Sequence, residues 1–243
     1  MEHDAKRAAA APRPWRKVSS LRPRASEWRL LVLSLSLLAT PLAWSQAAPS
    51  PTSQGGAELA PWNLGASVSG YSFENQSDYV QPTVTIDHSV LHLEARYQYE
   101  ALHTGSLWMG WNFSWGKQLQ LALTPMFGGV FGAQAGIAIA VEWTLSWGPL
   151  SWFSEPELVL DFKDSSQNNI NVWSQLTVQP LAWLQLGLAI QRNRAHAEKV
   201  DVAWGPALGF TVWKLTLTGY WFNPGNSSTQ YWSVALALTA FEL

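Results

Sequence analysis

The segment Leu91-His92-Leu93-Glu94-Ala95-Arg96-Tyr97-Gln98-Tyr99-Glu100 decides the fold class of this chain. Apolar or aromatic residues occupy every odd position, and polar or charged residues occupy every even one. Successive side chains of an extended strand point to opposite faces. The period of two therefore predicts a β-strand with one apolar and one polar face.

The same alternation recurs from Trp62 to the end of the sequence. No stretch there is uniformly apolar over the length that a spanning helix needs, so a membrane crossing requires a closed sheet, in which every backbone group is paired. The pattern predicts twelve antiparallel strands, at residues 62–73, 79–87, 89–101, 104–115, 117–126, 135–147, 149–162, 170–179, 182–193, 200–213, 214–223 and 229–241.

The predicted connections alternate in length along the chain. They are tight around His88, Gly116, Gly148, Leu181 and Trp213, and longer at 74–78, 102–103, 127–134, 163–169, 194–199 and 224–228. Short periplasmic turns that alternate with longer outer loops are typical of transmembrane barrels, and this order puts both termini in the periplasm.

Tryptophan is abundant, with sixteen residues in a chain that has no Cys. Its amphipathic ring favours the boundary between apolar and aqueous surroundings. One aromatic girdle is predicted beside the tight turns, from Trp62, Trp115, Trp147, Trp183 and Trp213. A second is predicted near the longer loops, from Tyr71, Phe73, Tyr79, Tyr97, Tyr99, Phe162, Trp221, Phe222, Tyr231 and Trp232.

The N-terminal part has the composition of an export signal. Eight of the fifteen basic residues precede residue 30, an apolar run follows at 30–38, and small residues end the segment at Ser45-Gln46-Ala47. We expect a signal peptide at 1–47, a disordered periplasmic lead-in at 48–61 and a barrel at 62–243. Residues 48–243 carry seven basic and fourteen acidic side chains, a formal charge of −7, which argues against a nucleic-acid partner.

These features together resemble a bacterial outer-membrane β-barrel of the porin-like class, with about twelve strands. The resemblance covers residues 62–243 and implies an all-β, transmembrane antiparallel barrel in the bacterial outer membrane. It also implies outer-membrane lipids and the barrel-assembly machinery as partners. The C-terminal strand departs from the class pattern, because its apolar positions Leu236, Leu238 and Ala240 are opposite in parity to Phe241.

The polar face of the strands predicts the lining of the lumen: His92, Glu94, Arg96, Gln98, Glu100, Glu142, Asp161, Gln175 and Gln191, with Glu155 and Glu157 beside them. Two interpretations remain open. A closed network around Arg96 fills a narrow barrel, since a buried charge needs a partner. Alternatively, an acid-rich constriction lines an aqueous path with a mild preference for cations.

The sequence thus predicts a porin-like channel for small hydrophilic solutes, with no cofactor and no metal site. The alternative is a non-conducting structural or lipopolysaccharide-binding barrel, for which Arg192, Arg194 and Lys199 form a basic cluster near a predicted outer loop. Solvated loop charges are the other interpretation of that cluster.

We do not expect an enzyme. The less favoured lipid hydrolase needs a Ser and a His on one face, whereas His88 and Ser89 are adjacent on a strand and point to opposite faces. The Gly-dense segment 124–132 is predicted to be either a loop folded into the lumen or a tight turn.

Overall fold

The computed structural model describes residues 61–74, 76–195 and 200–242. The predicted signal peptide, residues 48–60 of the predicted lead-in, and Lys199 lie outside these residues. No helix in the described ranges is long and apolar enough to cross a membrane.

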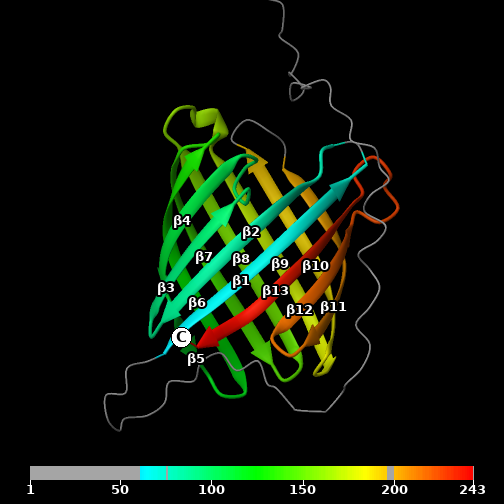
Figure 1. Ribbon diagram of the computed structural model, residues 1–243. Helices are drawn as coiled ribbons and strands as arrows, with labels where there is room; N and C mark the ends of the chain where they lie inside the picture. The colour runs from blue at the N-terminus through cyan, green and yellow to red at the C-terminus, as the bar shows by residue number, and fades with distance from the viewer. Residues whose placement is uncertain (1–60, 75, 196–199, 243) are drawn as a thin grey trace, which may run out of the picture. The chain divides into compact units, whose positions relative to one another are not determined.

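The described chain forms one antiparallel sheet that closes on itself (Figure 1). Its strands are β1 (Trp62–Phe73), β2 (Tyr79–His88), β3 (Leu91–Tyr97), β4 (Thr104–Trp111), β5 (Phe113–Trp115), β6 (Leu119–Gly132), β7 (Gly136–Trp147), β8 (Leu150–Asp161), β9 (Asn169–Leu181), β10 (Leu184–Ala195), β11 (Asp201–Val212), β12 (Leu215–Phe222) and β13 (Tyr231–Glu242), with a 3-10 turn η2 (Ser165–Gln167). Strands adjacent in sequence pair with each other, except β4 and β5, which both pair with β6 instead; β1 pairs with β13 and closes the sheet. Because the sheet is closed, no strand edge with unpaired backbone groups faces the lipid.

The predicted strand 104–115 is interrupted once, at Asn112. Its two parts, β4 and β5, both pair with β6 and together make one interrupted strand of the barrel. The predicted twelve-stranded barrel is therefore confirmed. The interruption is held by polar contacts. The Asn112 amide nitrogen donates to an Asp87 carboxylate oxygen at 2.6 Å, and the Thr124 hydroxyl donates to the Asn112 side-chain oxygen at 2.7 Å.

The two ends of the barrel differ in their connections. Residues 89–90, 116–118, 148–149, 182–183 and 213–214 make the turns of one end, here called the short-turn end. β1, β3, β6, β8, β10 and β12 end at the other end, here called the long-loop end, where the connections 98–103, 133–135, 162–168 and 223–230 lie. β1 begins and β13 ends at the short-turn end. At Gly148 this tight reversal requires a positive φ of 54°, which glycine adopts without steric cost.

The outer wall is apolar over its whole height. Outward side chains such as Leu107, Ile139, Leu188 and Val202 are half or more exposed, in alternation with buried inward residues. The tryptophans of the first predicted girdle are all exposed and lie at the short-turn end. Such a surface is stable only against lipid, because in water it would leave a large apolar area exposed.

Two details of the predicted strands were wrong. The strand predicted over 89–101 ends at Tyr97, because Gln98 turns the chain with a positive φ of 59°. The segment 124–132 is neither an inserted loop nor a turn, since it continues β6 as far as Gly132 and pairs with β4 and β7. There Met126 and Val130 are buried, whereas Phe127 and Phe131 are exposed on the outer wall.

The pairing of the C-terminal strand contains one irregularity. The register between β1 and β13 shifts by one residue between Leu64 and Ala66. As a result Leu238 pairs with Ala66, while the backbone of Phe241 pairs with Leu64. The extra residue at such a bulge changes which residues of the two strands lie opposite each other. Alternation along the sequence does not reveal this change.

Candidate functional site

The centre of the interior is the guanidinium of Arg96, on β3. It donates to a Glu155 oxygen at 2.6 Å, to a Glu94 oxygen at 2.8 Å and to a Glu157 oxygen at 3.2 Å. A Glu142 oxygen lies 3.6 Å away. Because Glu155 and Glu157 belong to β8, Arg96 reaches past β4, β6 and β7 to join two distant strands.

Aromatic rings cover the remaining sides of this cation. The guanidinium carbon lies 4.3 Å from the ring centroid of Tyr99 and 4.9 Å from that of Trp108. The Tyr99 hydroxyl donates to the second Glu155 oxygen at 2.6 Å. Tyr99 lies in the loop that follows β3, and burial raises the pKa of its phenol well above the ordinary value, so it stays a proton donor.

Two smaller polar groups extend the network along the same wall. Toward the short-turn end, His92 is held between Asp87, at 2.8 Å, and Glu94, at 3.5 Å. Toward the long-loop end, a Glu100 oxygen accepts hydrogen bonds from the Ser106 hydroxyl and the Trp108 indole. We call this whole set, from Asp87 to Glu157 on β2–β4, β7 and β8, the charged wall.

Glu142 differs from the other carboxylates of the charged wall. Its side chain is 26% exposed, compared with 5% for Glu94, 5% for Glu155 and 1% for Glu157. Four carboxyl groups surround one guanidinium, and Glu142 is the one that solvent in the lumen reaches most easily.

The opposite wall is made of small side chains. In the strand order, β10–β13 and β1 lie across the barrel from β4, β6 and β7. Many inward positions of β1, β10, β11 and β13 are Gly, Ala or Ser, in alternation with large outward residues, whereas β12 places Thr and aromatic side chains inward. We call this set the small wall: Gly187, Ala189, Ala203, Gly205, Ala207, Gly209, Ala235, Ala237, Ser67 and Ser69.

Aromatic side chains fill the long-loop end of the small wall. Tyr71 stacks on Tyr79 with ring centroids 4.8 Å apart, and Phe222 stacks on Tyr231 at 4.7 Å. Phe73, Trp173 and Tyr220 join the same group. The second predicted girdle was therefore wrong for these residues: Tyr71 and Phe222 are buried, and only Tyr97, Phe162 and Trp232 of that set are clearly exposed.

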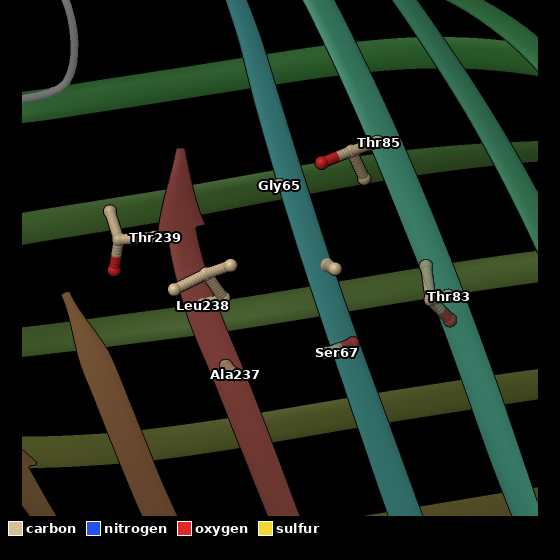
Figure 2. Close-up of a pocket in the computed structure, with 8 residues that line it drawn as sticks. Gly65, Ser67, Thr83, Thr85, Ala237, Leu238 and Thr239 are labelled. Atoms are coloured by element: carbon tan, nitrogen blue, oxygen red, sulfur yellow. The ribbon is translucent and has the colours of Figure 1, made fainter. Parts of the chain in front are cut away.

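Two hollows open toward the short-turn end. The larger, of about 780 Å³, is bounded by three of the tight turns and by polar residues that include Gln120, Ser146, Thr177 and Gln185. The smaller, of about 250 Å³, lies over β13, β1 and β2, where Ser67, Thr83, Thr85 and Ala237 leave space (Figure 2). The interior is thus wide and polar at the short-turn end and more densely filled toward the long loops.

The remaining predicted lumen residues fall into two groups. Gln175 and Gln191 face the aromatic group, where their side-chain oxygens accept hydrogen bonds from the hydroxyls of Tyr220, at 3.1 Å, and Tyr231, at 2.9 Å. Gln98 lies in the connection after β3, and Asp161 is the last residue of β8, where its side chain binds the adjoining connections. Gln98 donates to the Val80 carbonyl in the turn after β3, and Asp161 accepts from the backbone N–H groups of residues 135, 163 and 164.

The structure also places the residues considered for other chemistry. Both ring nitrogens of His92 face carboxylates, and Asp164, in the loop before η2, has its pKa lowered by hydrogen bonds from Ser166. Among the described residues, no group of three or more His, Asp or Glu side chains has the geometry of a metal site. Sequence alternation alone could not have found the contribution of Tyr99, because it lies beyond the end of β3.

Comparisons with known proteins identify a fold but no family. No protein-family model matches the chain, and no curated protein matches it. Among solved structures, the KdgM porin aligns with a TM-score of 0.51 and 9% identity, over 72% of this chain and 98% of KdgM. The KdgM porin in complex with disordered oligogalacturonate gives the same values. The Acinetobacter baumannii outer membrane protein Omp33 aligns with a TM-score of 0.44 and 9% identity, over 74% of this chain and 98% of Omp33. The likeness to KdgM is one of fold, and the chain has the closed barrel architecture of bacterial outer-membrane porins.

Proposed function

We propose that the protein is a porin-like channel of the bacterial outer membrane, through which small hydrophilic solutes pass passively, with a preference for cations over anions. The observation that carries the proposal is the division of the interior into a charged wall and a small wall. The partners in this proposal are outer-membrane lipids around the barrel, the assembly machinery during insertion, and the passing solutes.

The small wall supplies the space for a solute. Ser67 and Ala237 line an open hollow in its short-turn half, whereas Ala203 and Ala207 farther along are buried against Tyr220 and Phe222. The charged wall opposite is fixed by its own ion pairs. A path along the small wall would run between the rigid carboxylate group and the inward backbone of β10–β13. It begins in the hollow of about 780 Å³ at the short-turn end.

The charge of the interior favours cationic and neutral solutes. The one guanidinium of the charged wall is already bonded to carboxylates, whereas Glu142 is partly exposed to the lumen. A ring of carboxylate charge in a low-dielectric wall attracts cations and repels anions. The KdgM porin was solved with oligogalacturonate, a polyanion; we propose that the present channel disfavours solutes of that charge.

A non-conducting barrel is the second candidate, and a specific observation favours it. The network around Arg96 and the stacked group of Tyr71, Tyr79, Phe222 and Tyr231 both occupy the interior. If together they seal the long-loop end, the barrel is a structural or lipid-binding element. The outer-membrane lipid hydrolase finds no support of this kind.

Conductance and ion selectivity separate the two candidates. The refolded chain is inserted into a planar bilayer, its folding is checked by heat-dependent gel mobility, and the reversal potential is measured in a salt gradient. We expect discrete steps and a cation-selective potential. Glu142→Gln should lower the ratio of cation to anion permeability by about two- to fivefold, since the partly screened charge contributes about 1 kcal/mol.

Glu74→Gln serves as the matched control, because Glu74 is exposed in a loop at the long-loop end. It should leave the permeability ratio within error of the parent value. A folded barrel that gives no steps refutes the channel. Steps whose selectivity is unchanged by Glu142→Gln refute the assignment of the selective carboxylate.

A further inference from the structure

We propose that Arg192 and Arg194 form a binding site on the outer wall for the phosphate groups of lipid A, the membrane anchor of lipopolysaccharide. The proposal rests on the outer-membrane location in the proposed function, but not on conduction. It replaces the expectation of a loop cluster, because both arginines belong to strand β10.

The register of β10 directs both side chains outward. Leu186, Leu188 and Ile190 of this strand are exposed on the lipid-facing surface. Arg192 and Arg194 continue the same parity, so they point to the same face. In contrast, Gln191 of the opposite parity reaches the interior, where it bonds Tyr231.

Apolar outward residues surround these arginines. Arg192 pairs with Val172 on β9 and with Val202 on β11, and Arg194 pairs with Ile170. Val202 is 50% exposed and Ile170 is 47% exposed, both on the outer wall. The two cations therefore interrupt a surface that otherwise contacts lipid tails.

The height of the pair along the barrel matches the edge of the apolar band. β10 starts beside the tight turn 182–183, so Arg192 is eight residues and Arg194 ten residues beyond Leu184. At a strand rise of about 3.3 Å and a tilt of about 40°, these steps are about 20 and 25 Å along the barrel axis. The apolar band of an outer-membrane barrel is about 25 Å tall, so the guanidinium groups lie at its outer boundary.

No carboxylate neutralises the pair within the described part of the chain. Every ion pair recorded there involves Arg96 or His92. Both Arg192 and Arg194 are exposed. A guanidinium at a lipid boundary is stabilised by an anionic headgroup, and its planar donors match a phosphate in a bidentate arrangement.

The spacing favours a ligand with more than one phosphate. Alternate residues of a strand are about 6.5 Å apart, and their long side chains can diverge to engage phosphates at the two ends of one headgroup. Lipid A carries phosphates on both sugars of its disaccharide and acyl chains that would lie against Val172, Ile190 and Val202. A phospholipid presents a single phosphodiester and satisfies only part of this arrangement.

The test is a titration of the refolded barrel, in zwitterionic detergent, with diphosphorylated lipid A, followed by native mass spectrometry. Dephosphorylated lipid A, phosphatidylglycerol and inorganic phosphate are the comparison probes. Each arginine near a charged headgroup contributes about 1 kcal/mol, so Arg192→Gln and Arg194→Gln should each weaken lipid A binding about fivefold, and the double variant about 25-fold. Lys163→Gln, in the loop 162–168, is the matched control and should bind as the parent does.

Each outcome decides the proposal. Preferential binding of diphosphorylated lipid A, lost in the double variant and kept in Lys163→Gln, supports it. Equal binding of dephosphorylated lipid A or of phosphatidylglycerol, displacement by equimolar inorganic phosphate, or parent-like binding by the folded double variant overturns it. Conductance is measured separately, so a silent barrel that binds lipid A refutes the channel alone, and a conducting barrel without this preference refutes the lipid site alone.

Discussion

Replacing Arg96 with Met tests whether the charged wall is held by a single cation. The guanidinium side chain is 1% exposed and bonds three carboxylates at 2.6–3.2 Å. Removing one partner of a buried ion pair costs about 3–5 kcal/mol, because the charge left behind has neither water nor a counter-ion. Here four glutamates remain, so we expect the upper part of that range.

The assay is equilibrium unfolding of the refolded barrel by urea in lipid vesicles, followed by tryptophan fluorescence. The chain has sixteen Trp residues, many of them at the lipid boundary, so insertion and unfolding give a large signal. Arg192→Met is the matched control: an arginine on the outer wall with no recorded ion pair should change the free energy of unfolding by only about 0.5 kcal/mol.

A second substitution makes the reasoning refutable even if the single variant folds poorly. Glu155 is the carboxylate nearest to Arg96, at 2.6 Å. Adding Glu155→Gln to Arg96→Met removes one of the repelling charges and should recover part of the lost free energy. If Arg96→Met unfolds within about 1 kcal/mol of the parent, or if the second substitution deepens the loss, the charged wall does not depend on this cation.

Three further predictions concern the walls and the pairing between strands. Ala237→Trp on the small wall, where it lines an open hollow, should reduce single-channel conductance by about half or more by filling the path, whereas Leu236→Trp, which faces lipid, should leave it unchanged. Gly205→Ala should lower the free energy of unfolding by about 1–3 kcal/mol, since its Cβ would overlap the Trp221 carbonyl oxygen; Gly219→Ala, where a Cβ meets no atom within 4 Å, is the control, and equal losses would contradict the close-approach argument. Tyr220→Phe should cost about 1 kcal/mol in the same unfolding assay through loss of the bond to Gln175, and no change would show that this bond is not maintained in the membrane.

Alternation along the sequence was enough to predict the barrel and most of its strand ends. In strands such as Leu91–Tyr97 and Gly136–Trp147, one face contacts lipid and must be apolar. Whether a residue is apolar or polar therefore predicts whether its side chain points outward or inward. The errors arose where parity is broken locally. The regular alternation of inward and outward residues is interrupted at three places: the backbone turn at Gln98, the break in the strand at Asn112 and the register shift near Leu64. None of these has a signature in the composition of the sequence.

The interior was harder to predict, because parity gives the face of a residue but not its height or its partners. Glu142, Glu155 and Arg96 were assigned to one lumen, but their convergence depends on the tilt of strands that are far apart in sequence. The inward direction of Tyr71 and Phe222 was missed because aromatic residues near loops were all attributed to the lipid boundary. The inward Ala and Gly positions of β11 were visible in the sequence and would have indicated the small wall.

The division of the interior into two walls has a consequence for how such a protein can change over evolutionary time. A substitution at Arg96 or Glu155 leaves an unbalanced charge, so the charged wall changes only through compensated pairs of mutations. Ser67 and Ala237 line an open hollow and record no side-chain bond to another described residue, so each can be exchanged alone, and each exchange alters the bore. A lineage with this barrel can therefore acquire new solute preferences by single mutations while the elements that keep it folded are conserved.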